Sequence, residues 1–407
     1  MMLMQSRALV QRSRLLGPAF VAAVAYVDPG NVATNTAAGA SYGYLLLWVL
    51  VGATLMAGLV QYLSAKVGWL TGESLPALVG SRTRRSVRLT YWVQAELVAV
   101  ATDIAEIVGG AVALQLLFGL PTVLGAVITA TVSTGLLLVQ DRRGQRSFER
   151  VITGLLAIVT IGFLSGLVIS QPDPAQAAAG LLPRLAGADS ALLAVGMLGA
   201  TVMPHAVYLH SALVRDRHGK ADATCARPTL RAIRLDVTLA MVVAGAVNIG
   251  MLLLAASTLF GIEVNGLQAA QAAIGDQLGP VIATTFALGL LASGLASTSV
   301  GGYAGAVIME GLLHRRIPLL WRRVLTAIPA LILLAAGLDA TRLLILSQVI
   351  LSFGIPFALV PLVRIARDRS LMRLVPTLRA TIACAWVVVG IVVALNCVLI
   401  ALTVLEV

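Results

Sequence analysis

Runs of about 20 predominantly apolar residues recur along the whole chain, and that length of α-helix crosses the hydrocarbon core of a bilayer. The strict alternation of polar and apolar residues that marks a membrane β-strand does not appear in these runs. The pattern therefore predicts an all-α polytopic membrane protein. Eleven spans are expected, at residues 15–38, 43–65, 89–118, 120–140, 151–170, 190–214, 235–259, 279–312, 324–338, 342–363 and 380–403.

Two of these spans are interrupted near their middle. The first contains the sequence DPGN at residues 28–31, and the sixth contains MPH at residues 203–205. Proline and glycine are the poorest helix formers, so each sequence predicts a break. Five spans precede the sixth, so spans 1–5 and 6–10 would cross the membrane in opposite directions. Paired broken helices in two inverted halves are typical of the substrate site of a secondary transporter, although proline kinks can also be purely structural.

The domain organisation follows from this pairing. We expect a single transport domain over residues 1–407, with inverted repeats at about 12–185 and 186–366 and an extra helix at about 378–404. No P-loop for ATP is evident in the sequence. An ion gradient is therefore the expected source of energy.

Composition and charge support a membrane location. Of the 407 residues, 59% are hydrophobic and 12% are charged, whereas a soluble domain has roughly 25% charged residues. The net charge of +11 could suggest a nucleic-acid partner. With the N-terminus in the cytoplasm, however, all of the 29 Lys and Arg residues except Arg184 and Arg342 fall on the cytoplasmic side. The positive-inside rule then places the N-terminus inside and the C-terminus outside, and the charge faces lipid headgroups.

The two breaks should expose oxygen atoms in the middle of the membrane. Each proline lacks an N–H and clashes with the carbonyl four residues earlier, at Ala25 and at Ala200. Both carbonyls would lie at the negative end of a half-helix. The side chains of Asp28 and Asn31 add further oxygens. Such a cluster, with one full negative charge, suits a cation.

Met203 places a thioether beside the second break. Ca²⁺ and Mg²⁺ prefer shells made only of oxygen, whereas Mn²⁺, Fe²⁺, Co²⁺ and Cd²⁺ accept sulfur. As a ligand, Met203 would discriminate against the hard cations. The alternative is that Met203 only packs, as most buried methionines do.

The third span carries three acids, Glu96, Asp103 and Glu106, on one face of a helix. An acid within a membrane is costly unless it is paired, hydrated or neutral. These three residues form either a proton relay or a set of structural hydrogen bonds to neighbouring helices. His210, in the sixth span, is equally open between packing and proton handling.

The DPGN and MPH motifs in these spans resemble those of the Nramp family of proton-coupled divalent metal transporters. The resemblance to bacterial manganese-transporting members covers nearly the whole chain. It implies a LeuT-like fold of ten core helices plus an eleventh, and import of Mn²⁺, Fe²⁺ and Cd²⁺ with protons by alternating access. Four further segments carry it: YWVQAELVAVATDIAE (91–106), GATVMPHAVYLHSAL (199–213), LASGLAS (291–297) and LSQVILSFGIPFALVPL (346–362).

The resemblance also implies residue roles. Gln348 would join the predicted metal shell in some states, and Asn248 would lie near the permeation path. The shell is then Ala25, Asp28, Asn31, Ala200, Met203 and Gln348. On sequence alone Arg322 and Arg323 fit ordinary cytoplasmic charges, but the family's proton route matches them. The predicted proton pathway comprises Asp28, Glu96, Asp103, Glu106, His205, His210, Arg322 and Arg323.

The main alternative is a sodium-coupled amino acid transporter of the same fold, although one acid and a thioether suit a small ion better. An enzyme is not expected, since the sequence has no HExxH or GxSxG motif. We expect no cofactor and no obligate protein partner, only metal ions, protons and the lipid bilayer. The expected location is the plasma (inner) membrane of a bacterium.

Overall fold

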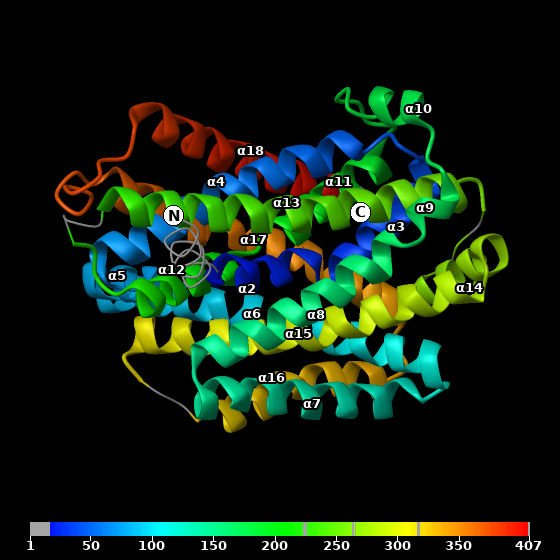
Figure 1. The fold of residues 1–407 in the computed structure, drawn as a ribbon, viewed down its shortest axis with the longest axis horizontal. Helices are drawn as coiled ribbons and strands as arrows, with labels where there is room; N and C mark the ends of the chain where they lie inside the picture. The colour runs from blue at the N-terminus through cyan, green and yellow to red at the C-terminus, as the bar shows by residue number, and fades with distance from the viewer. Residues whose placement is uncertain (1–16, 223–225, 263, 265, 316–317, 406–407) are drawn as a thin grey trace, which may run out of the picture.

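The computed structural model describes residues 17–405, except 223–225, 263, 265 and 316–317 (Figure 1). The N-terminal arginines of the predicted cytoplasmic tail lie outside the described residues. The described chain is helical, with these elements: α2 (Pro18–Val24), η1 (Ala25–Val27), α3 (Pro29–Tyr42), α4 (Leu47–Thr71), α5 (Leu75–Arg82), α6 (Arg85–Phe118), α7 (Thr122–Arg143), α8 (Gln145–Leu164), α9 (Leu167–Ser170), α10 (Pro174–Ala179), α11 (Ala188–Thr201), α12 (Pro204–His218), α13 (Ala226–Thr258), α14 (Leu267–Leu278), α15 (Pro280–Leu313), α16 (Leu319–Ala335), α17 (Ala340–Arg367) and α18 (Arg379–Leu405).

Each of the eleven predicted apolar ranges is largely helical in this structure. Within the described residues, nine helices are long and apolar enough to cross a membrane. The two other ranges are the first, which is interrupted, and the ninth, where α16 has 17 residues. The number of helices that actually span the membrane therefore stays a prediction.

The first interrupted helix breaks at a single extended residue. Helix α2 ends in the 3₁₀ turn η1, and Asp28 then adopts an extended conformation with φ −72° and ψ 168°. Helix α3 begins at once with Pro29, whose fixed φ and missing N–H suit the first helical position. The predicted break at 28–31 is therefore too long, since Gly30 and Asn31 already lie in the first turn of α3.

The second break begins earlier than predicted. Helix α11 ends at Thr201, and both Val202 (φ −103°, ψ 77°) and Met203 (φ −77°, ψ 117°) leave the helical conformation. Helix α12 starts at Pro204, so His205 is helical, and the break covers 202–203 rather than 203–205. Both motifs therefore place proline at the start of the second half-helix, directly after the extended residue.

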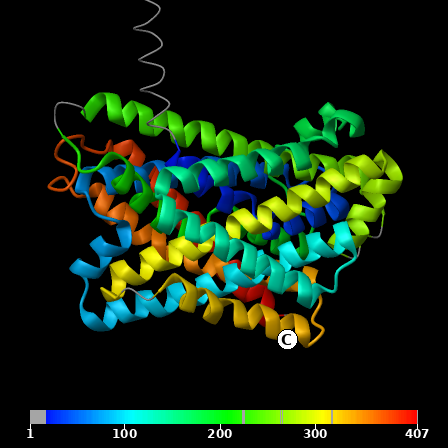
Figure 2. The same ribbon diagram turned by 60° about the horizontal axis from the view of Figure 1, so that its bottom comes forward.

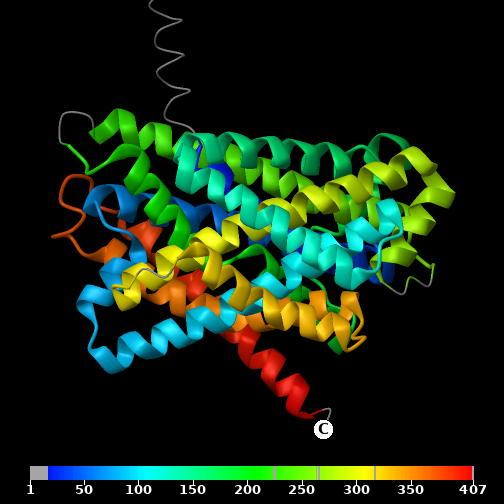
Figure 3. The same cartoon turned by 90° about the horizontal axis from the view of Figure 1, so that it is seen from below.

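The broken helices lie at the centre of the molecule. Figure 1 shows most helices running along its long axis, and Figure 2 shows α2 and α3 enclosed between other helices. Helices α6, α11 and α12 are mostly buried, whereas α7 and α18 are mostly exposed. Helices α7 and α16 pack together on one side, and α18 extends away from the bundle towards its C-terminal end (Figure 3).

The described segments that carry the predicted cytoplasmic charges gather at one end of the bundle. Helix α5, the end of α12 and the α17–α18 connection lie there, opposite α10 and α14 (Figures 1 and 3). Assignment of this end to the cytoplasm stays a prediction, as do the boundaries of the two repeats.

Candidate ion-binding site

Asn31 connects the two breaks. Its backbone N–H donates to Asp28 Oδ1 at 2.8 Å, so Asp28 caps α3. Its side-chain Nδ2 donates to the same carboxylate oxygen at 2.7 Å and to the carbonyl of Ala200 at 2.9 Å. All three residues are completely buried. The structure therefore brings together three of the six residues predicted for the metal shell through direct hydrogen bonds.

The orientation of the Asn31 amide differs from the expectation that its oxygen joins the cluster. Its Nδ2 lies between the carboxylate and the carbonyl, and its Oδ1 accepts a long bond of 3.4 Å from Thr201 Oγ1. The amide N–H groups occupy this position because they are the donors that satisfy both oxygens.

Gln348 approaches the same carboxylate from α17. Its Nε2 lies 3.5 Å from Asp28 Oδ2 and donates to Ser347 Oγ at 3.2 Å. Its Oε1 is buried and has no hydrogen-bond partner. A Cβ at Gly30 would lie 1.6 Å from Gln348 Nε2, so this approach requires glycine in the DPGN motif. Gln348 thus adds an unused oxygen beside Asp28.

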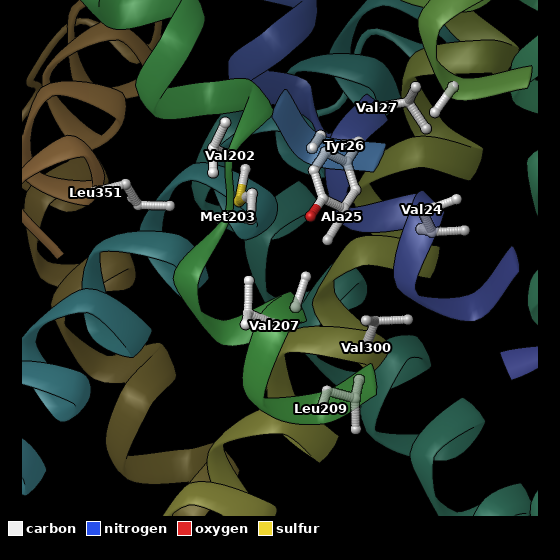
Figure 4. Packing of buried hydrophobic residues seen from close by; sticks show 14 of the residues in the cluster. Val24, Ala25, Tyr26, Val27, Val202, Met203, Val207, Leu209, Val300 and Leu351 are labelled. Carbon is white, nitrogen blue, oxygen red and sulfur yellow. The ribbon is translucent and has the colours of Figure 1, made fainter. Parts of the chain in front are cut away.

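Met203 and Ala25 complete the predicted set. Met203 is the extended residue before α12 and is fully buried, and Ala25 begins the 3₁₀ turn. Figure 4 shows the Met203 sulfur on the side of its segment that faces Ala25 and Tyr26. Helix α11 and the 3₁₀ turn are in contact. The position is compatible with both readings of Met203, as a ligand and as a packing residue.

Two of the three acids on this face of α6 pair with the two arginines of α16. Glu96 Oε1 lies 2.9 Å from Arg322 Nη2, and Asp103 forms an ion pair with Arg323. Both arginine side chains are almost completely buried, so they are not the solvated cytoplasmic charges that the sequence alone suggested. A Cβ at Gly305 would lie 1.9 Å from Arg322 Nη1, which shows how closely α15 packs over this guanidinium.

Glu106 differs from Glu96 and Asp103, the other two acids on the same face of α6, which is called the acidic face below. Both of its carboxylate oxygens are buried and have no hydrogen bond. A Cβ at Gly301 would lie 2.9 Å from Glu106 Oε2, so α15 lies directly over the carboxyl group. Among the described residues, Glu106 is therefore a buried acid without a counterion, whereas Asp103 is paired with Arg323.

The two histidines of α12 belong to different surroundings. His205 Nδ1 lies 3.4 Å from Thr102 Oγ1 of α6, next to Asp103 in the sequence, and its Nε2 is buried without a partner. His210 Nδ1 lies 2.6 Å from Gln61 Oε1 of α4. His205 therefore contacts α6 and His210 contacts α4, and a role for either histidine in a proton pathway stays a prediction.

Asn248 of α13 holds the first break in place. Its Nδ2 donates to the carbonyl of Tyr26 at 2.6 Å, and its Oδ1 accepts from Asn35 Nδ2 at 2.9 Å. Ser293 of α15 donates to the carbonyl of Val27 at 2.6 Å. Sequence reasoning did not single out Tyr26, Asn35 or Ser293 for this role. The sequence feature that could have identified them is a polar group within an apolar span, because such a group needs a hydrogen-bond partner there.

The two ends of the first interrupted helix have different surroundings. A cavity of about 810 Å³ lies along α3, the α13–α14 connection and the start of α17, with Asp339 and Arg342 in its lining. At the opposite end, the backbone N–H groups of Gly17 and Ala19 each donate to the carboxylate of Asp236 at 3.0 Å. Helix α2 is therefore hydrogen-bonded to α13 at the end that we expect to be cytoplasmic.

Within the described part of the chain, no three His, Cys, Asp or Glu side chains gather as a metal cluster. A metal at the breaks would thus depend on one acid together with amide, carbonyl and thioether groups.

The model of the family described as Natural resistance-associated macrophage protein-like, or Nramp, matches residues 19–402. This match covers almost the entire chain. The chain belongs to the Nramp family. A relative named divalent metal cation transporter MntH from Mycobacterium tuberculosis H37Rv is 56% identical over 392 residues, which are 96% of this chain and 92% of the relative. A relative of the same name from Bacillus subtilis 168 is 45% identical over 385 residues, 94% of this chain and 90% of the relative.

Solved structures agree with this Nramp assignment. The Eremococcus coleocola manganese transporter, in complex with an aromatic bis-isothiourea substituted compound, superposes with a TM-score of 0.81 at 32% identity, covering 95% of this chain and 86% of that chain. MhsT in complex with L-phenylalanine gives a TM-score of 0.57 at 14% identity, covering 93% and 98%, which shows the fold alone. These structures confirm the predicted LeuT-like fold. The Nramp family is a family of transporters, which agrees with the prediction that the protein is not an enzyme.

Proposed function

We propose that this protein is a secondary transporter that imports Mn²⁺, together with Fe²⁺ and other divalent transition metals such as Cd²⁺, coupled to protons. The observation that carries the proposal is the hydrogen-bonded link between the two breaks, from Asp28 through Asn31 to the carbonyl of Ala200. It joins one carboxylate to the free end of a half-helix in a completely buried place. The names of the relatives, divalent metal cation transporter and manganese transporter, support a metal substrate.

Metal binding at this place requires a small rearrangement. Rotation of the Asn31 amide by about 180° would replace Nδ2 with Oδ1, so that an oxygen faces the ion together with Asp28 and Ala200. The unbonded Oε1 of Gln348 is a further oxygen within reach of a side-chain movement. Met203 would supply the sulfur from the extended segment before α12. These groups carry one negative charge, which leaves part of the charge of a divalent ion unbalanced and favours release.

The acidic face supplies a second place for a proton. Glu106 carries no hydrogen bond and lies on the same helix as Asp103, which Arg323 holds as an ion pair. Of these two acids, only Asp103 has a counterion in the described part of the structure. We propose that a proton moves between Asp28 and the acids of α6, close to His205. The proton would then leave towards Glu96 and Arg322.

An amino acid substrate is the weaker alternative. The fold permits it, since the similar MhsT structure contains L-phenylalanine. An amino acid, however, brings a carboxylate that would meet the charge of Asp28. The buried arginines Arg322 and Arg323 already have acidic partners.

Transport by the purified full chain in proteoliposomes tests the proposal. We expect uptake of radiolabelled Mn²⁺ that increases with an inward proton gradient, is unaffected by an inward Na⁺ gradient, and is accompanied by acidification of the lumen. Uptake of radiolabelled amino acids driven by Na⁺, without Mn²⁺ uptake, would establish the alternative instead.

A further inference from the structure

A second cavity lies on the outer face of the bundle, and none of its lining residues belongs to the two breaks. It has a volume of about 520 Å³ and is formed by α4, α13 and the residues that lead into α18. Figure 1 shows these three elements next to one another along one side of the molecule. One end of the cavity is polar and lies towards the end of the bundle that holds the basic connections. The other end is apolar.

The polar end contains two cations, and no acid is among the described residues that line the cavity. The side chain of Lys66 is 2% exposed, and its Nζ donates to Thr377 Oγ1 at 2.9 Å. No described carboxylate forms an ion pair with it, and two of its three N–H donors have no described acceptor. A buried charge without a counterion is unfavourable, so this ammonium group requires an anion.

Arg234 stands at the same end. Its Nη2 donates to the hydroxyl of Tyr62 at 3.1 Å, and its guanidinium carbon lies 5.3 Å from the centre of the Tyr62 ring. The aromatic ring therefore holds the guanidinium in a fixed position with donors to spare. An anion between these two cations would offset their repulsion.

The apolar end opens to the outside of the bundle. Leu55 is 72% exposed and Val242 is 61% exposed, and both line the cavity. Helices α4 and α13 are both long and apolar enough to cross a membrane, so this exposed surface faces hydrocarbon. Leu59 and Met241 continue the apolar lining inward. The cavity thus joins the hydrocarbon region to a cationic site at its border.

We propose that this cavity binds an anionic phospholipid, with the headgroup phosphate between Lys66 and Arg234 and an acyl chain along Leu55 and Val242. A compact ammonium and a fixed guanidinium are both phosphate binders, and the apolar end selects a lipid over a free anion. With the predicted orientation, the lipid belongs to the cytoplasmic leaflet. The proposal requires only that the chain spans a membrane and does not depend on which ion is transported.

Lipid binding by the full chain in neutral detergent tests this site. Native mass spectrometry measures the apparent affinity for phosphatidylglycerol and for phosphatidylcholine with the same acyl chains. We expect the wild type to prefer phosphatidylglycerol. Lys66→Gln and Arg234→Gln should each weaken phosphatidylglycerol binding about fivefold, with little effect on phosphatidylcholine. The matched control is Arg231→Gln, which removes an exposed charge from α13 outside the cavity.

Three results would overturn the proposal. The first is equal binding of the two lipids by the wild type. The second is an equal loss in Arg231→Gln, which would indicate general surface charge. The third is a thermal stabilisation by inorganic phosphate or glycerol 3-phosphate as large as that by phosphatidylglycerol, which would indicate a free anion as the ligand. Because Arg234 is exposed, its variant is expected to fold even if Lys66→Gln does not.

Discussion

Among single residues, substitution of Met203 tests whether this side chain is a metal ligand or only a packing residue. Replacement of Met203 by Ala leaves room for a water molecule, an oxygen ligand that hard cations accept. Mn²⁺ uptake should fall only moderately, Cd²⁺ uptake should fall most, and Ca²⁺ should begin to compete with Mn²⁺. Competition of Ca²⁺, Mg²⁺ and Cd²⁺ against radiolabelled Mn²⁺ uptake measures this change of order.

Met197→Ala is the matched control for this selectivity experiment, because Met197 is also completely buried, on the preceding helix α11. Both substitutions should lower stability by roughly 2–5 kcal/mol, as truncation of a buried methionine does. Only Met203→Ala should alter the order of ions. If it excludes Ca²⁺ as well as the wild type does, Met203 is a packing residue.

Glu106 and Asp103 should respond differently to neutralisation. Glu106→Gln preserves size and leaves no new unpaired charge, so the protein should fold and bind Mn²⁺ while metal-evoked acidification of liposomes is largely lost. Asp103→Asn leaves Arg323 buried without its partner and should destabilise the fold by roughly 3–5 kcal/mol. A pH-sensitive dye in the lumen and thermal unfolding give the two readouts. Normal proton flux in Glu106→Gln would limit Glu106 to a structural role.

At the scale of elements, the short helix α2 depends on a carboxylate from α13. Asp236 accepts the N–H groups of Gly17 and Ala19, and loss of such a cap costs about 1 kcal/mol. Asp236→Ala should therefore loosen α2. A cysteine introduced at the fully buried Ala22, in a background without native cysteines, should react about fivefold faster with a water-soluble thiol reagent.

The control for this labelling experiment is Asp216→Ala, which removes a half-exposed acid whose ion pair with Arg215 lies on α12. It should leave the reaction rate of the cysteine at position 22 unchanged. An unchanged rate in Asp236→Ala would show that the side chain does not hold α2 closed.

The broken helices could be predicted from sequence because their cause is local. Proline removes a backbone N–H and disfavours a continuous helix, so the breaks were found to within a residue or two. Proline alone is not sufficient, because Pro356 and Pro361 lie inside the continuous helix α17. Their limits were displaced because proline is favourable at the first helical position, and Pro29 and Pro204 each begin a helix.

The contacts between distant elements could not be predicted in this way. Asp103 and Arg323 are 220 residues apart, and their pairing depends on how α6 packs against α16. The direction of the Asn31 amide likewise depends on the carbonyl of Ala200, 169 residues away. The family resemblance pointed to these residues, but only the packing shows that two arginines are buried and that His210 faces α4.

At the scale of the whole molecule, the distribution of charge fixes the expected orientation. The loop at Lys220 should face the cytoplasm, and α14 should lie on the outer side. In a background without native cysteines, an impermeant thiol reagent added outside intact cells should label Ala272→Cys and spare Lys220→Cys. Both positions are exposed, so accessibility within the fold does not bias the result. The reverse pattern would contradict the orientation and would also move the lipid site to the other leaflet.

We propose that a divalent metal binds where the two broken helices meet, at the carboxylate of Asp28. The most direct test is radiolabelled Mn²⁺ uptake by proteoliposomes that contain equal amounts of wild type, Asp28→Asn and the control Asp189→Asn, an exposed acid at the start of α11. Removal of the only full charge from a dehydrated site should cost several kcal/mol, roughly a hundredfold or more in affinity. We therefore predict no uptake above background for Asp28→Asn and normal uptake for Asp189→Asn. Substantial Mn²⁺ uptake by Asp28→Asn would show that the ion binds elsewhere.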